Sequence, residues 1–362
     1  MMKKVLKSLL VILLLIPMSG CTNVKNYIAY SVYPVGYLID RIAGGMIESI
    51  SIQSSEMVQV SNIIPEYQEI LNDSSYFFHI GELEPYLDLY ANEIKNTGVQ
   101  IVDLSNLNAI YKFQRYSMVY VDGKESYVEG PYYNSDLFNN IDMNENDLLL
   151  WMDPIGMLSM ANDIYSILAS NYVEAAQVFN ENYKKLESDL ISLDAAYQGL
   201  ASKLKKENKA IKFVSLSASF GNWQKAYGIQ VYPVCLSKYG AIPSDSELEV
   251  IKRRILADEV KYIAYEPNMS EDMLNLFNEL ENELNLTRVN LNNVSSLTPS
   301  QTANNKDYLS LMYENLNVLE NMATEVINRN PQKEEVNEND DALNEDTKED
   351  NKENNKTEDV KE

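Results

Sequence analysis

The sequence predicts an α/β protein of two lobes, each with a mostly parallel sheet flanked by helices, joined by one long rigid helix. In both halves of the chain, short apolar runs typical of strands alternate with helical stretches, which is the pattern of parallel sheets with crossover helices. Between the halves, apolar residues recur at spacings of four and three, the stripe of a long amphipathic helix. The stripe consists of Phe179, Tyr183, Leu186, Leu190, Leu193, Tyr197, Leu200 and Leu204.

Residues 172–207 form the predicted linking helix. At about 1.5 Å per residue it would reach roughly 50 Å, more than the diameter of a small domain. Such a helix is usually either a coiled-coil arm or a strut between two lobes. An arm would need the chain to return through a long partner helix, and none follows directly. The strut is therefore the better interpretation, with Asp153 predicted to cap the helix that leads into it.

The strut separates a first lobe, 27–171, from a second lobe, 208–330. In the first lobe the pattern predicts strands at 27–32, 46–52, 76–78 and 98–103, and helices at 35–43, 65–71 and 84–93. Residues 104–146 have poor periodicity and indicate loops or a short hairpin around Asp122-Gly123. In the second lobe we expect strands at 211–217, 229–234, 260–265 and 287–291, and helices at 220–227, 244–258, 270–284 and 307–328.

The N-terminus indicates export and lipid attachment. Lysines precede an apolar run too short to be a permanent membrane span, and Cys21 follows Ser19-Gly20. This resembles a bacterial lipobox, although Met18 replaces the more usual Leu. Residues 1–20 are then a lipoprotein signal peptide, Cys21 carries the lipid, and 21–26 form a tether at the extracytoplasmic face of the cell membrane. The alternative is a plain secretory signal with an incidental cysteine.

The composition excludes several classes of function. A net charge of −24 argues against nucleic acid, and part of that charge lies in residues 331–362, a segment expected to be a disordered acidic tail. The chain has one histidine, His79, and Cys235 is the only cysteine besides Cys21. Cysteine-based metal motifs and a histidine cluster are therefore excluded, and no nucleophile–histidine–acid set is possible beyond one that uses His79. We expect a monomer that is not an enzyme, and the sequence indicates no certain cofactor.

From Tyr27 to about Met322, the chain resembles the solute-binding lipoproteins of bacterial zinc/manganese ABC transporters, the family with a rigid helix between two lobes. The motifs that carry the resemblance, in order, are Tyr33-Pro34, Leu83-Glu84-Pro85, Trp151-Met152-Asp153-Pro154, Ser219-Phe220-Gly221, Lys261 to Glu266, and Asp307 to Met312 followed by Asn315-Leu316. The resemblance implies an ABC permease in the cytoplasmic membrane as the partner and Zn²⁺ or Mn²⁺ as the cargo.

The same resemblance implies a metal site of three histidines and one carboxylate between the lobes. The positions that match those ligands hold Gln59, Leu149, Ser217 and Asn292, so the site is predicted to be degenerate. Hydroxyl, carboxamide and aliphatic groups cannot replace three imidazoles as ligands of Zn²⁺. The sequence therefore argues against high-affinity zinc or manganese binding of the family kind, although the fold does not depend on the ion.

Four side chains are candidates for contact with a solute in the cleft: His79, Ser217, Glu266 and Asn292. His79 could instead hydrogen-bond the adjacent loop, and Glu266 could anchor a loop. Ser217 and Asn292 could be inert replacements. Glu84 is predicted to be a carboxylate at a helix N-terminus, stabilised by the helix dipole.

Three hypotheses remain open. The first is the binding lipoprotein of a metal ABC transporter with a degenerate site. The alternative is a non-transport surface lipoprotein that uses the same fold, its tyrosine-rich loops and its acidic tail to bind a protein or another solute. The third is a changed solute, polar and uncharged or cationic, held by Glu266, His79 and Asn292.

Overall fold

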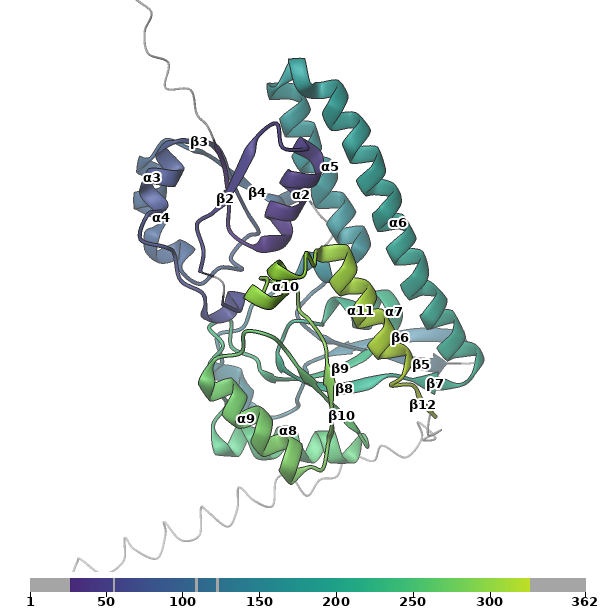
Figure 1. The fold of residues 1–362 in the computed structure, drawn as a ribbon. Helices are drawn as coiled ribbons and strands as arrows, with labels where there is room; N and C mark the ends of the chain where they lie inside the picture. The colour runs from purple at the N-terminus through teal and green to yellow at the C-terminus, as the bar shows by residue number, and fades with distance from the viewer. Residues whose placement is uncertain (1–26, 55, 108–109, 122–123, 326–362) are drawn as a thin grey trace, which may run out of the picture. The chain divides into compact units, whose positions relative to one another are not determined.

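The computed structural model describes residues 27–54, 56–107, 110–121 and 124–325, and it contains two four-stranded parallel sheets, one in each lobe. A long helix lies along elements of both lobes (Figure 1). The predicted fold class is therefore confirmed. Among the described residues, no helix has the length and apolar character to cross a bilayer. The expected signal peptide, the tether and the acidic tail lie outside the described residues.

The first lobe is built on a sheet with strand order β2-β1-β3-β4. Its strands are β1 (Tyr27–Tyr30), β2 (Glu48–Ser51), β3 (Ser74–His79) and β4 (Gln100–Asp103). Its helices are α2 (Tyr33–Ala43), α3 (Tyr67–Asn72) and α4 (Leu87–Asn96), with short 3₁₀ turns η1 (Val58–Val60) and η2 (Leu104–Leu107). Helix α2 starts two residues before the predicted position, because Pro34 suits its first turn, and it ends at Gly44 with φ of 60°.

The second lobe has strand order β11-β10-β8-β9. Its strands are β8 (Lys212–Ser217), β9 (Gln230–Cys235), β10 (Tyr262–Tyr265) and β11 (Thr287–Asn290), with the short strands β7 (Lys209–Ala210) and β12 (Thr324–Glu325). Its helices are α7 (Asn222–Tyr227), α8 (Asp245–Ala257), α9 (Glu271–Glu283), α10 (Pro299–Ala303) and α11 (Tyr308–Glu320). The short helix α10 was not predicted, and α11 ends eight residues before the expected boundary.

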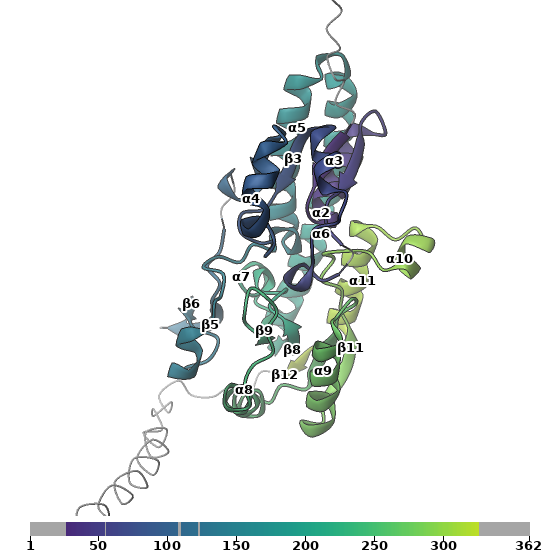
Figure 2. The same cartoon turned by 90° about the vertical axis from the view of Figure 1, so that its left-hand side faces the viewer.

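The linking helix is α6 (Ala176–Lys206), and a second long helix, α5 (Pro154–Asn171), lies beside it (Figures 1 and 2). A 3₁₀ turn, η5 (Val173–Ala175), reverses the chain between them, so α6 begins at 176 rather than 172. Every residue of the predicted stripe except Tyr183 is buried, and Tyr183 stacks on Tyr165 of α5 at 4.7 Å. The strut does have a long partner helix, but that helix precedes it in the chain.

The weakly patterned segment forms an antiparallel hairpin, β5 (Arg115–Val121) and β6 (Lys124–Gly130), then the turns η3 (Asp136–Asn140) and η4 (Leu150–Met152). Figure 2 shows the hairpin beside the second lobe. Tyr133 lies in the core of that lobe and donates a hydrogen bond to the carbonyl of Pro233 at 2.8 Å. Arg115 pairs with Asp258 at 3.2 Å. The range expected to form the first lobe thus contributes to the cores of both lobes.

Candidate functional site between the lobes

The four predicted ligand positions lie where the two lobes meet. Gln59 is on η1 of the first lobe, and Leu149 immediately precedes η4. Ser217 ends β8, and Asn292 follows β11. These last two positions are at the carboxyl edge of the second sheet, where open α/β sheets usually bind ligands.

Glu266, which follows β10, is the centre of a hydrogen-bond network in the second lobe. Its side chain is fully buried. Its carboxylate accepts from the Ser217 amide at 3.1 Å, from Asn293 Nδ2 at 3.0 Å, and from the hydroxyls of Ser215 and Ser217. Burial raises the pKa of Glu266, and these donors oppose the rise. The Ser217 amide, the Ser217 hydroxyl and Asn293 Nδ2 each donate to the carboxylate, whereas Ser215 shares its single proton between Glu266 and the Ser217 carbonyl. The acceptor positions of Glu266 are therefore largely filled.

A weak polar contact links this network to the first lobe. The hydroxyl of Ser217 also bonds the buried hydroxyl of Ser219. Gln59 Nε2 lies 3.5 Å from that Ser219 oxygen, at the limit of a hydrogen bond. Within the described part of the chain, the buried Gln59 Oε1 atom has no hydrogen-bond partner. The structure therefore brings Gln59, Ser217 and Glu266 together, as side chains that bond mainly within the protein.

The polar groups of Asn292 form hydrogen bonds with the loop that contains it and with α11. Its side-chain oxygen accepts from the Val294 amide at 2.7 Å and supports the positive φ of 56° at Val294. Its backbone amide and carbonyl are both bound, at 2.8 Å, by the side chain of Asn315 on α11. The buried Asn292 Nδ2 is without a partner among the described residues. Asn293, the next residue, supplies the contact with Glu266.

Leu149 contributes only its backbone to polar contacts. Its side chain is buried in the core, its amide donates to Asp147, and its carbonyl accepts from Asn222 Nδ2 at 3.0 Å. The motif after it keeps its structural role, because Trp151 Nε1 donates to the Asn293 carbonyl at 2.7 Å. An aliphatic side chain thus occupies the position where the resemblance expects a metal ligand.

His79 lies at the end of β3 in the first lobe, whereas Glu266 follows β10 in the second lobe. Its ring stacks on Phe77 with centroids 5.7 Å apart, and Nδ1 lies 3.1 Å from the carbonyl of Gly81. Burial lowers its pKa, while Asp103 and the Gly81 carbonyl oppose the shift. Within the described part of the chain, His79 forms no hydrogen bond with Glu266. These contacts agree with the interpretation in which His79 hydrogen-bonds the adjacent loop.

Two buried carboxyl groups are prominent in the structure but were not predicted as such. Asp147 packs against Gly221 so closely that a Cβ there would lie 2.2 Å from Oδ2, and burial raises its pKa to about 7. Its only sequence signal was its position two residues before Leu149. Glu84, expected near a helix terminus, is instead buried three residues before α4 and accepts from the Ser31 hydroxyl. Burial raises the pKa of Glu84 to about 8.

The space left between these groups is small. A cavity of about 20 Å³ is lined by Gln59, Leu149 and Ala218, together with polar residues such as Asp147. This is room for about one water molecule. Within the described residues, no three His, Cys, Asp or Glu side chains are grouped so that they could hold a metal ion.

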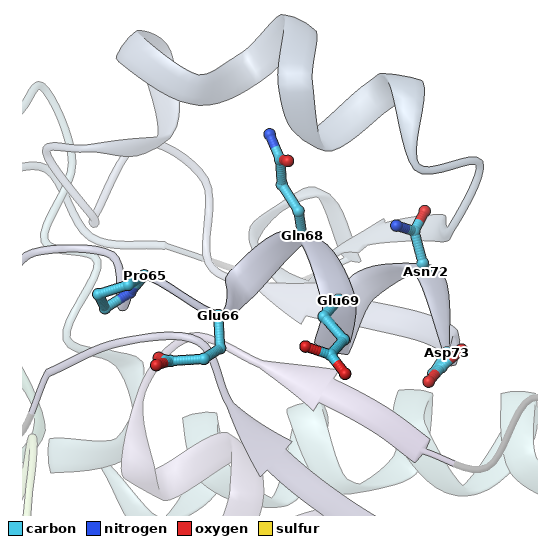
Figure 3. A pocket seen from close by; sticks show the side chains of 6 residues that line it. All are labelled: Pro65, Glu66, Gln68, Glu69, Asn72 and Asp73. Atoms are coloured by element: carbon cyan, nitrogen blue, oxygen red, sulfur yellow. The ribbon is translucent and has the colours of Figure 1, made fainter.

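A wider depression lies on the outside of the first lobe, over α3 (Figure 3). It is lined by Pro65, Glu66, Gln68, Glu69, Asn72 and Asp73. The polar side chains fan outward from the helix and do not converge on a common point. This depression therefore shows no ligand-binding geometry.

Comparison with known proteins identifies relatives of the chain. The sequence profile of the zinc-uptake complex component A (periplasmic) family matches residues 28–322. The zinc-binding lipoprotein AdcA of Streptococcus pneumoniae R6 is 27% identical over 175 residues, which are 48% of this chain and 34% of that protein. The zinc-binding protein AdcA of Streptococcus pyogenes serotype M1 is 25% identical over 170 residues, 47% of this chain and 32% of that one. The matches thus span about a third of these relatives.

Solved structures show the same fold at low sequence identity. The zinc-bound AdcA of Streptococcus pneumoniae superposes with a TM-score of 0.63 at 20% identity, covering 86% of this chain and 60% of that one. The periplasmic zinc-binding protein TroA of Treponema pallidum gives a TM-score of 0.63 at 14% identity, covering 82% and 99%.

Proposed function

Because the chain belongs to the zinc-uptake complex component A family, whose members are solute-binding proteins rather than enzymes, we propose that it is the binding lipoprotein of a zinc- or manganese-type ABC transporter with a degenerate metal site. Its partner would be an ABC permease in the cytoplasmic membrane. The lipid on Cys21 would hold it at the extracytoplasmic face, a placement supported by the lipoprotein name of its pneumococcal relative. Residues 1–26, which carry that anchor, lie outside the described residues.

The observation that carries the proposal is the carboxylate of Glu266, whose acceptor positions are largely filled by donors of the protein itself. A zinc site of this family needs three imidazoles and a free anionic oxygen, because strong donors must replace the hydration shell. Here the matching positions offer a carboxamide, an aliphatic chain, a hydroxyl and a second carboxamide. The carboxylate of Glu266 already accepts bonds from Ser217 and Asn293, and that of Asp147, which lines the cavity beside Gln59 and Leu149, accepts from the Leu149 amide. The residues present do not fit a zinc ion of the family kind.

Calorimetric titration with Zn²⁺ and Mn²⁺ tests this part of the proposal. The protein would be the chain without residues 1–21, beside a variant that also ends at Glu325 and so lacks the carboxylates of the acidic tail. We expect no submicromolar binding by either protein. Saturable binding of one ion with a submicromolar dissociation constant in the shorter variant would show that the site is intact in function.

The alternative, a surface lipoprotein that has lost transport, is favoured by the size of the cavity between the lobes. About 20 Å³ is too little for a sugar, a peptide or another polar solute. Adjacent genes for an ABC permease and ATPase, and co-purification of the chain with that permease from membranes, would support the transporter role. A gene that stands alone, with no permease retained, would favour the alternative.

A further inference from the structure

The turn between β2 and α3 places apolar side chains in the cores of both lobes. Val58 is fully buried in the core that α2 and α6 share, whereas the adjacent Met57 is fully buried in the core of the second lobe. Val60, half-buried, packs against that second-lobe core as well. In Figures 1 and 2 this turn is the short dark purple segment that lies between the lobes.

The second lobe meets the turn at Gly240. Its φ of 65° is a conformation that favours glycine. A Cβ at Gly240 would lie 3.0 Å from Val60 Cγ1 and 3.3 Å from Gln59 Cβ on one side, and 3.1 Å from Met273 Cε on the other. The absence of a side chain at Gly240 therefore allows the first lobe to pack directly on the second.

We infer that this contact is a latch, formed by Met57 and Val60 against Gly240 and Met273, that holds the lobes closed without a cargo. The Tyr33 amide also donates a backbone hydrogen bond to the Ser295 carbonyl, at 3.3 Å, and this bond joins the two lobes. A ligand favours closure only through its higher affinity for the closed form. Burial of Met57 provides a driving force for closure that needs no ligand.

The latch goes beyond the proposed function and does not depend on it. Zinc could bind or fail to bind in the titration above whether or not the lobes close on their own. With the latch engaged, the chain presents its closed-lobe surface to a partner with or without metal. The test must therefore measure the distance between the lobes, and not zinc affinity.

Pulsed electron–electron double resonance on the full chain measures that distance between the lobes. Spin labels would be placed at Asn72→Cys on α3 and Asp272→Cys on α9, both exposed, in a Cys21→Ser background; Cys235 is buried and does not compete for the label. We expect one narrow distance distribution, identical with excess Zn²⁺ and with a chelator. The double variant Met57→Asp/Val60→Asp should shift it to longer distances, as should Gly240→Val, which opposes the same contact from the second lobe.

The matched control is Met46→Ser, a change at an exposed methionine of the same lobe, which should leave the distribution unchanged. Circular dichroism and a cooperative melt would establish that each variant is folded. A parent chain with a broad distribution, or one that narrows only when zinc is added, would overturn the latch. So would folded latch variants from both lobes that retain the parent's distances.

Discussion

The buried carboxylate of Glu266 is hydrogen-bonded to donors of the protein itself. A fully buried carboxylate needs several donors, and here the donors come from β8 and from the loop after β11. Of these donors, only Ser217 occupies a position that the resemblance matches to a metal ligand. Its amide and hydroxyl stabilise the second lobe through their bonds to Glu266.

The assignment of the ligand positions predicts a gain of function. The quadruple variant Gln59→His/Leu149→His/Ser217→His/Asn292→Asp restores three imidazoles and one carboxylate. We expect it to bind one Zn²⁺ with a dissociation constant of about 1 μM or below, by calorimetry. The matched control keeps Leu149 and changes the other three, and it should bind more weakly. If the folded quadruple variant shows no more zinc binding than the parent, the positions are assigned wrongly.

The raised pKa of Glu84 predicts a pH-dependent stability difference. In the folded chain burial raises the pKa of Glu84 to about 8, from an ordinary value of 4.5. The folded state therefore binds more protons than the unfolded state between these values, and the parent loses stability as pH rises through that window. Glu84→Gln has no such loss. The free energy of unfolding of Glu84→Gln, measured relative to that of the parent, should therefore rise by on the order of 2 kcal/mol between pH 5 and pH 8.

Thermal or urea unfolding at both pH values measures this change for Glu84. The partner variant Ser31→Ala removes the hydroxyl that donates to the carboxylate, and it should be destabilising at both pH values. A Glu84→Gln effect that is independent of pH would show that the buried carboxylate is ionised throughout.

At the scale of elements, α6 stabilises both lobes through its apolar stripe. Leu193 is fully buried, whereas Ile191, two residues earlier, is 49% exposed. Leu193→Ala should lower the free energy of unfolding by about 2–5 kcal/mol, because it leaves a cavity in the shared core. The matched variant Ile191→Ala should change it by about 0.5 kcal/mol or less. Urea denaturation measures both, and equal effects would mean that the stripe is not the packing face.

The ends of the elements were predictable where local chemistry sets them. The Ser244 hydroxyl and the Glu247 carboxylate form a capping box at α8, and Asp153 accepts from the Ile155 amide at the start of α5. The pairing of α5 with α6 was not predictable in this way. No Gly or Pro marks the turn at η5, so only the packing of the two helices shows where the chain reverses.

At the scale of the whole molecule, the hairpin segment ties the middle of the chain to the second lobe. Arg115 contacts both Asp258 and the ring of Tyr232, and both partners of the ion pair are largely buried. Arg115→Met should reduce the free energy of unfolding by about 1–3 kcal/mol, since it leaves Asp258 with fewer donors. Thermal unfolding tests this.

The control for Arg115 is the more exposed ion pair between Lys209 and Glu207. Lys209→Met should lower the free energy of unfolding clearly less than Arg115→Met, because water screens the pair. Similar losses for the two variants would indicate that the contact of Arg115 with the second lobe adds no stability of its own.

The sequence by itself determined the α/β class, the two lobes, the long helix and the family, because strand and helix periodicities and ordered motifs are local signals. It also placed Gln59 and Ser217 in one region, by resemblance. Only the tertiary structure decided that Glu266 is held by donors from two strands' ends, that Met57 is buried in the core of the opposite lobe, and that the hairpin segment packs on the second lobe. Those outcomes depend on contacts between residues far apart in the chain, whose distances and burial no local pattern encodes.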